Sequence, residues 1–294
     1  MNKAHASLQH FRHQLANYEA LPQLALLGLV CGLGAGLLIS LLRIAIDLPL
    51  AALLPDHVEN FEGLSTSERF LLPVIGSLVL AYLFTLWPLM RCKVGIVHLM
   101  ERLSYHQGII PIKHMYAQFI SACIALICGH SVGREGPAVY LGACLSSWIG
   151  QLLHIPHNSQ RLLIACGAAA AISAAFNTPL AGVIFAMEVI LLEYTVAGFT
   201  PVIVASVSAS IVTRVLFDGA PIFDVPSFTV ASMSEVPWII ATGAVIGIIA
   251  AAFIKLMLLA TKSKRWPLQL RFILAGLITG AVAVLYPQVM GTGY

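Results

Sequence analysis

Apolar residues in this chain form long stretches separated by short polar segments. The stretches 21–46, 70–90, 236–254 and 270–286 are close to or above the roughly 20 residues that a helix needs to cross a bilayer. Shorter apolar segments, cut by Gly, Pro or small polar clusters, lie between them: 94–100, 115–128, 138–153, 162–176, 179–192 and 196–216. Broken helices at membrane depth occur where their ends are buried or line a cavity, as at transporter substrate sites. The pattern predicts an all-α polytopic membrane protein with broken helices; a plain bundle with some short helices is the alternative.

Composition agrees with a membrane location. Of 294 residues, 59% are hydrophobic and only 10% are charged, whereas soluble domains carry roughly 25% charged residues. The mean hydropathy is +0.90. These values exclude a soluble enzyme, a disordered tail and a nucleic-acid binder. The six cysteines lie in or beside apolar runs without the spacing of a metal site or disulfide framework. We therefore expect no metal and no cofactor.

Loop charges predict an orientation. Residues 47–68 hold five acids and no Lys or Arg, whereas residues 91–113 and 255–271 are rich in Lys and Arg. Because basic residues gather on the cytoplasmic side, we expect these two basic segments and the N-terminus inside, and the acidic segment 47–68 outside. Leu8, Phe11 and Leu15 recur at helical spacing, so residues 1–20 are expected to form a cytoplasmic amphipathic helix on the membrane surface.

One charged pair stands in the apolar centre, in the segment Gly133-Arg134-Glu135-Gly136-Pro137. Each charge costs roughly 2.5–3.5 kcal/mol on insertion scales, so such residues are functional candidates, with a structural ion pair as the alternative. The glycines and Pro137 suit the start of a helix. A helix N-terminus binds anions through unpaired N–H groups and its dipole. The segment therefore predicts an anion site in which Glu135 is a gate: ionised, its carboxylate occupies the site, and protonated it moves away.

Two neighbouring features were weighed with this segment. Asn177-Thr178-Pro179 is a second capped helix start, either part of the site or an ordinary membrane-helix cap. His130, beside the charged pair, is either a pH sensor or a histidine without that role.

These motifs resemble the CLC family of chloride channels and chloride/proton exchangers, most closely its bacterial voltage-gated chloride channel branch. GREGP at 133–137 resembles the second selectivity-filter segment of the family, with Glu135 at the gating glutamate. The stretch 167–189 resembles the helix pair that follows. The resemblance implies an inverted-repeat fold of broken helices, chloride as the transported ion and a homodimer in a bacterial inner membrane.

Two positions depart from the family pattern. The first filter segment is typically Gly-Ser-Gly-Ile-Pro, and its counterpart here includes Val94, Gly95 and Ile96, so valine replaces the serine hydroxyl. The exchangers also carry an inner proton-relay glutamate, whose position is Val189, directly after Glu188. Since valine carries no proton, passive conduction is expected. Glu193 is a nearby substitute relay or a solvated carboxylate at a helix end.

The resemblance also implies a division of the chain. Residues 21–216 match the first repeat with its filter segments, and residues 217–294 match the start of the second repeat. The third filter segment and the pore-lining tyrosine of the family come later, so the chain is expected to be truncated, and Tyr294 is not that tyrosine.

The sequence therefore predicts transmembrane chloride transport through a passive pathway gated by Glu135, and not an enzyme. A proton-coupled chloride exchanger and a carrier of another anion, such as fluoride or nitrate, are the alternatives. A remote alternative is a membrane serine hydrolase, because residues 129–133 read G-x-S-x-G around Ser131. That motif needs a strand–turn–helix setting and later acid and histidine partners in the right order, which this chain lacks.

Overall fold

A computed structural model describes residues 21–54, 61–90, 92–217, 233–260 and 266–292. Within these ranges the regular elements are all helical, and six helices are long and apolar enough to cross a membrane. The elements, in chain order, are α2 (Leu21–Leu53), η1 (Phe61–Gly63), α3 (Thr66–Leu86), α4 (Ile96–Tyr105), α5 (Lys113–Ile127), α6 (Glu135–Leu153), α7 (His157–Phe176), α8 (Pro179–Phe185), η2 (Ala186–Leu191), α9 (Val196–Leu216), η3 (Met233–Glu235), α10 (Val236–Ala260), α11 (Leu268–Leu285) and η5 (Pro287–Val289).

Helix α7 forms the centre of the fold. It packs against α2, α6, α8 and α9, and 83% of its membrane-length segment is buried. Its small residues allow close contact: a Cβ at Gly167 would overlap the backbone of Gly142 in α6, and a Cβ at Gly142 would overlap Gly167. Small residues at helix contacts are typical of membrane helix packing. This tight pair fixes the direction of α6, which carries the charged pair at its first turn.

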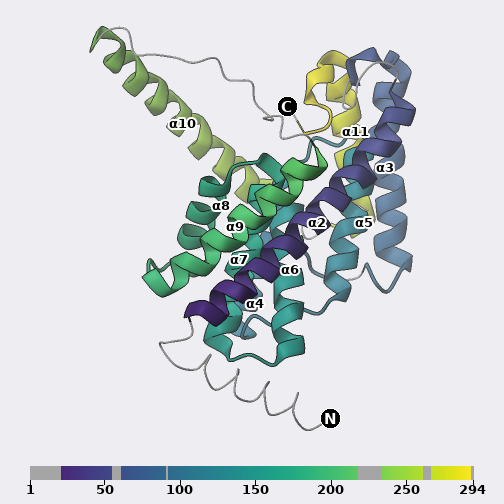
Figure 1. The fold of residues 1–294 in the computed structure, drawn as a ribbon. Coiled ribbons are helices and arrows are strands. Elements are labelled where there is room, and N and C mark those ends of the chain that lie inside the picture. The colour runs from purple at the N-terminus through teal and green to yellow at the C-terminus, as the bar shows by residue number, and fades with distance from the viewer. Residues whose placement is uncertain (1–20, 55–60, 91, 218–232, 261–265, 293–294) are drawn as a thin grey trace.

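Helix α2 crosses the bundle and packs along α9 (Figure 1). Glycines on one face of α2 make the approach possible, because a Cβ at Gly28 or Gly32 would meet backbone atoms of Pro201 or Ala205. Helices α3 and α11 form a second close pair, where Gly276 lies against Ser77. The position of α2 brings its middle and C-terminal turns over the ends of α7 and α9.

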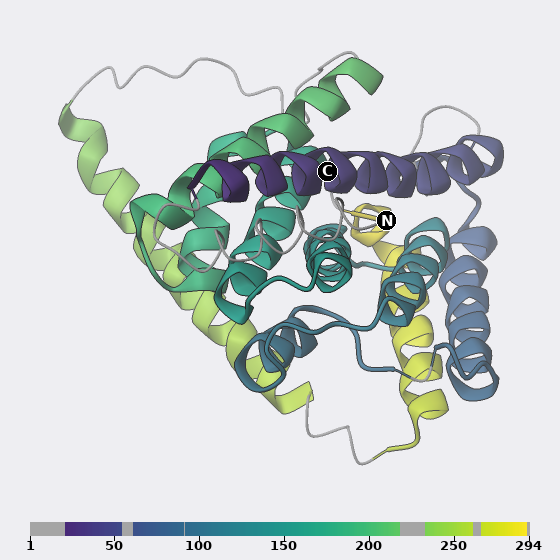
Figure 2. The ribbon, with the colours of Figure 1, turned by 60° about the horizontal axis from the view of Figure 1, so that its bottom comes forward.

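Helix α10 extends outward from the bundle in Figure 1, and α3 and α11 lie side by side at another edge in both views (Figures 1 and 2). No residue of α10 is buried. A helix that is apolar all round is typical of a membrane span or of a core element. The fold therefore consists of a packed set of helices around α7 and one apolar helix beside it.

The apolar runs predicted most helices to within a few residues. Two differences stand out. Asp47, expected in an outer loop, lies inside α2, where its Oδ2 is 3.3 Å from Nε of Arg43 one turn earlier. The run 179–192 is divided into α8 and a π-helical turn, Ala186–Leu191. The predicted amphipathic helix at 1–20 lies outside the described residues.

Candidate functional site

The charged pair stands where a short loop turns from α5 into α6. The loop begins with a left-handed glycine, Gly129, whose φ is +67°. Arg134 is the N-cap residue of α6, and the first helical hydrogen bond runs from the Ala138 N–H to the Arg134 carbonyl oxygen over 2.9 Å. The predicted helix start is therefore at the expected place, with Pro137 in its first turn.

The Glu135 side chain folds back from this helix start. A Cβ placed on Gly133 would overlap Glu135 Oε2, whereas a Cβ placed on Gly136 would meet nothing within 4 Å. The carboxylate therefore uses the space that the missing side chain of Gly133 leaves. The N–H groups of the first turn of a helix have no intrahelical acceptor. The carboxylate thus lies before the amino end of α6, where the helix dipole attracts negative charge.

Buried contacts hold the loop before α6. His130 Nε2 lies 3.2 Å from Ser77 Oγ of α3, and His130 is 7% exposed. The Gly291 N–H donates to the Gly129 carbonyl oxygen over 3.4 Å, and Arg134 Nη2 donates to Thr292 Oγ1 over 3.5 Å. His130 thus joins the loop to α3, which is a structural contact. Sequence reasoning missed the contribution of residues 290–292, because a contact across about 160 positions leaves no local pattern.

The segment that resembles the first filter segment of the family lies at the start of α4. Gly95 is the N-cap residue of α4 with φ +94°, a conformation that favours glycine. Val94 and Ile96 are partly buried and pack against the apolar core. Valine at position 94 therefore serves packing and offers no hydroxyl.

A buried aromatic cluster connects this segment to α6. The rings of His98 and His114 stack with centroids 5.1 Å apart, and Tyr140 of α6 lies beside them. His114 Nδ1 is 2.9 Å from the Lys93 carbonyl oxygen and 3.4 Å from the Tyr140 hydroxyl. Burial lowers the pKa of both histidines. Through His114, the residues before α4 are thus connected to Tyr140 of α6, five residues after Glu135.

The second capped helix start has a structural explanation. Asn177 ends α7 in the left-handed conformation, and its Oδ1 accepts hydrogen bonds from Ser210 Oγ (2.9 Å) and Arg214 Nε (2.7 Å). Thr178 is the N-cap residue of α8 without a side-chain capping bond, and Pro179 is the first helical residue. Asn177 therefore ties the α7–α8 corner to α9.

Comparison with known proteins identifies the family. The family model described as "Voltage gated chloride channel" matches residues 74–294. The chain belongs to this family, the CLC family. It is 31% identical to a ClcB-like protein of Ralstonia nicotianae over 77% of this chain and 54% of that protein. It is 30% identical to the voltage-gated ClC-type chloride channel ClcB of Salmonella typhimurium over 81% of this chain and 58% of that protein.

Solved structures show the CLC fold. A CLC-type fluoride/proton antiporter superposes with a TM-score of 0.76 at 22% identity, covering 94% of this chain and 68% of that one. A slow cyanobacterial Cl⁻/H⁺ antiporter gives 0.74 at 21% identity, covering 92% and 66%. The predicted fold class, an all-α polytopic CLC-type membrane protein, is thereby confirmed. The chain spans somewhat more than half the length of the Ralstonia and Salmonella relatives.

The position that the resemblance compares with the proton relay lies on the π-helical turn η2. Val189 is partly buried against the core, while Glu188 of the same turn and Glu193 beyond it are exposed. The exposure of Glu193 fits a solvated carboxylate. Val189 offers no proton acceptor at the position to which the resemblance assigns the relay.

The serine-hydrolase alternative does not fit the CLC fold. Ser131 follows helix α5, and no strand precedes it in the described part of the chain, whereas a nucleophile elbow joins a strand to a helix. Among the described residues, no group of three His, Cys, Asp or Glu side chains is arranged to hold a metal.

Proposed function

We propose that this chain provides a transmembrane pathway for chloride in which Glu135 is the gate. One observation carries the proposal: the Glu135 carboxylate folds back over Gly133, before the amino end of α6. An anion that uses the first-turn N–H groups of α6 needs the same space. The carboxylate and the anion therefore compete, and conduction requires the carboxylate to leave.

The state of the gate follows from its charge. An ionised carboxylate is stabilised at a helix N-terminus by the dipole and by hydrogen bonds to backbone N–H groups. A protonated one loses most of that electrostatic stabilisation, so acid pH and high chloride both favour the open arrangement. The remaining filter residues, Gly133, Arg134, Gly136 and Pro137, shape the helix start. The first segment, Val94 to Ile96, offers backbone groups alone.

Passive conduction is the favoured mode because Val189 has no titratable group. Proton-coupled exchange needs a carboxylate or equivalent along the inner half of the pathway, and the two carboxylates near position 189, Glu188 and Glu193, are exposed. Transport of fluoride or nitrate in place of chloride remains the rival, since Val94 supplies no hydroxyl to discriminate among anions. Flux ratios measured with each anion separate these outcomes.

The assembly and placement belong to the same proposal. We place the protein in a bacterial inner membrane as a homodimer, with the N-terminus and the basic segments 91–113 and 255–271 in the cytoplasm. Residues 21–216 act as the first CLC repeat, and residues 217–294 begin the second. Because relatives are longer than this chain, the test below also asks whether residues 1–294 conduct without further protein.

The experiment is chloride efflux from liposomes containing residues 1–294, with the external pH recorded. We expect efflux without proton movement in the wild type, and faster, less pH-dependent efflux in Glu135→Gln, which mimics the protonated gate. Glu193→Gln removes an exposed carboxylate and serves as the control. An unchanged rate and pH response in Glu135→Gln would exclude this gate, and a fixed chloride-to-proton ratio would exclude passive conduction. No efflux from folded, inserted protein would refute conduction by this chain alone.

A further inference from the structure

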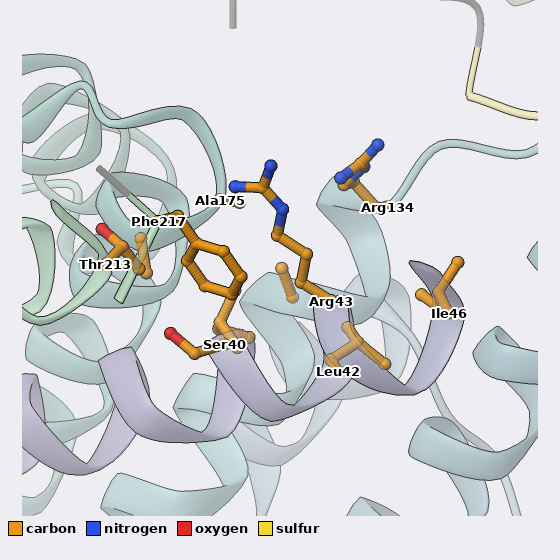
Figure 3. A pocket seen from close by; sticks show the side chains of 11 residues that line it. Ser40, Leu42, Arg43, Ile46, Arg134, Ala175, Thr213 and Phe217 are labelled. Carbon is orange, nitrogen blue, oxygen red and sulfur yellow. The ribbon is translucent and has the colours of Figure 1, made fainter. Parts of the chain in front are cut away.

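Basic side chains at the two ends of the bundle differ in whether the protein itself balances them. At the end where α2 and α9 finish, Arg43 lines a pocket together with Arg134 (Figure 3). Arg43 Nε lies 3.3 Å from Asp47 Oδ2, and its guanidinium lies 4.3 Å from the centre of the Phe217 ring. The charge of Arg43 is therefore satisfied within the chain.

The opposite end of the bundle is formed in part by the last turn of α3 and the first turn of α11. Helix α3 begins shortly after α2 ends and runs back through the bundle, so it finishes at that opposite end (Figure 1). There Gln269 Nε2 donates to Thr85 Oγ1 over 3.2 Å, and the rings of Phe84 and Phe272 lie with centroids 5.4 Å apart. Arg271, in the first turn of α11, lies next to these contacts.

Helix α5 starts at the same end. It meets the middle of α3 at its own last turn, because a Cβ at Gly76 would overlap the Cβ of Cys128. From that contact the 15-residue helix extends back to Lys113. The coil after α3 reaches the same place, since His114 Nδ1 lies 2.9 Å from the Lys93 carbonyl oxygen. Both lysines thus share this end with the start of α11.

The segments that contribute to this end carry many bases and almost no acid. Residues 91–113 hold four Lys or Arg and one acid, and residues 255–271 hold five Lys or Arg and no acid. The single acid is Glu101, whose Oε1 lies 3.6 Å from Lys93 Nζ. One acid cannot balance the remaining bases, so this end has a net positive charge.

Two of these bases are available to a ligand. Lys113 is exposed, and it has no hydrogen-bond or ion-pair partner among the described residues. Arg271 is partly exposed: its Nε is covered and makes no hydrogen bond, whereas its Nη groups at the tip remain accessible and have no partner in the described part of the chain either. The planar guanidinium group matches the geometry of a phosphate, and a lysine binds phosphate as a point charge.

Exposed aromatic side chains place these bases at a membrane surface. Trp87, the C-cap residue of α3, is 45% exposed, and Trp266, just before α11, is 52% exposed. Both adjoin helices that are long and apolar enough to cross a membrane. Tyr116, in the first turn of α5, is 51% exposed. Trp and Tyr are enriched at the level of the lipid headgroups, so the bases beside them lie at the depth of the lipid phosphates.

We infer that this basic edge, formed by Trp87, Lys113, Trp266 and Arg271, binds the headgroup of an anionic phospholipid. The lipid phosphate supplies the acceptor that the Arg271 guanidinium lacks, and the net negative charge of the lipid balances the bases. A zwitterionic lipid also carries a phosphate, but it has no net charge and gains less from the same contacts. The inference goes beyond the proposed function, because lipid binding requires no conduction.

The test is native mass spectrometry of residues 1–294 in a neutral detergent. The chain is titrated with phosphatidylglycerol or with phosphatidylcholine of the same acyl chains at one ionic strength. We expect the first phosphatidylglycerol to bind at least about tenfold more tightly than the first phosphatidylcholine. Arg271→Gln and Lys113→Gln should each weaken phosphatidylglycerol binding about fivefold, since each base near a membrane surface contributes roughly that factor. Neither substitution should change phosphatidylcholine binding, whereas a general structural defect would weaken both.

Arg214→Gln is the matched control. It removes the same charge from the last turn of α9, at the other end of the bundle, where Arg214 Nε donates to Asn177 Oδ1. Phosphatidylglycerol binding should stay within about twofold of the wild type.

The outcomes decide the inference whether or not liposomes show efflux. Loss of phosphatidylglycerol binding confined to Arg271→Gln and Lys113→Gln supports it. Equal affinities for the two lipids, or an equal loss in Arg214→Gln, would overturn it. Glycerol phosphate carries a headgroup charge without acyl chains, and its binding as tightly as phosphatidylglycerol would show a site for a soluble anion and contradict a lipid site. If Arg271→Gln fails to fold, Lys113→Gln still decides, because the Lys113 side chain is exposed.

Discussion

Replacing Gly133 by alanine should open the gate that we propose at Glu135, without changing any charge. The added Cβ would overlap Glu135 Oε2, so the carboxylate has to leave its folded-back position. The overlapping atom is the far end of a flexible side chain, and the backbone at Gly133 is not in the left-handed region. The substitution therefore acts on the gate and leaves the helix start intact.

The size of the effect follows from the cost of keeping the closed position. Overpacking of this kind costs about 1–3 kcal/mol, and a strained side-chain torsion about 0.5–1.5 kcal/mol. Because 1.4 kcal/mol is a factor of ten in an equilibrium constant, the closed population should fall about 5- to 150-fold relative to the open one. The free energy of unfolding should change by less than about 1 kcal/mol, since the carboxylate swings into other space.

The assay is chloride efflux from liposomes at neutral pH. We expect Gly133→Ala to approach the rate of Glu135→Gln, and the double variant to be no faster than Glu135→Gln alone. Gly136→Ala is the matched control, because it lies in the same motif and its Cβ would meet nothing within 4 Å. The steric argument would be refuted if Gly133→Ala and Gly136→Ala both showed the wild-type efflux rate. It would also be refuted if the double variant, Gly133→Ala with Glu135→Gln, were faster than either single variant.

Two further predictions concern stability. In an unfolding experiment in detergent, Gly32→Ala should lower the free energy of unfolding by about 1–3 kcal/mol, because its Cβ would overlap Ala205 in α9. Gly247→Ala in α10 is the control: its Cβ would meet nothing within 4 Å, so the free energy of unfolding should stay the same or rise slightly. Burial lowers the pKa of His98 and His114, so the unfolded state binds protons more tightly and stability should fall as pH drops below about 6.5. His98→Gln should reduce this loss of stability. The prediction is contradicted if the melting temperature of His98→Gln falls between pH 7.5 and pH 5 by as much as that of the wild type.

Most of the helical architecture could be predicted from apolar run length, because lipid requires backbone hydrogen bonds to be made within helices. The predicted end of the first helix was wrong, because a local ion pair lets the helix continue through a residue that the composition assigned to a loop. Asp47 looked like the beginning of an acidic loop, but its pairing with Arg43 one turn earlier lets α2 continue to Leu53. The π-helical turn Ala186–Leu191 has no comparable sequence signal, since its residues are ordinary helix formers.

The candidate site was predictable only in part. Glycines and a proline around Glu135 indicated the helix start, because those residues have specific backbone roles. The approach of Thr292 to Arg134 and of Ser40 to the pocket depends on how distant helices pack, and the sequence carries no local record of it. In the sequence, Arg43 only interrupts an apolar run. In the fold, Arg43 and Arg134 line the same pocket.

The adjacent charges of Arg134 and Glu135 illustrate why one helix start can both attract and exclude an anion. Each charge inside a membrane protein raises the free energy of insertion into the bilayer. A structural ion pair would lower that free energy without any role in transport. Here Arg134 and Arg43 line a pocket between α2, α6, α7 and α9, whereas the Glu135 carboxylate lies over Gly133. Arginine keeps its charge at all physiological pH values. In the gate that we propose, a proton on Glu135 removes the charge that competes with an anion for the helix end. The position of that carboxylate can be altered without a change of charge, by the substitution at Gly133, although the two side chains start at consecutive residues.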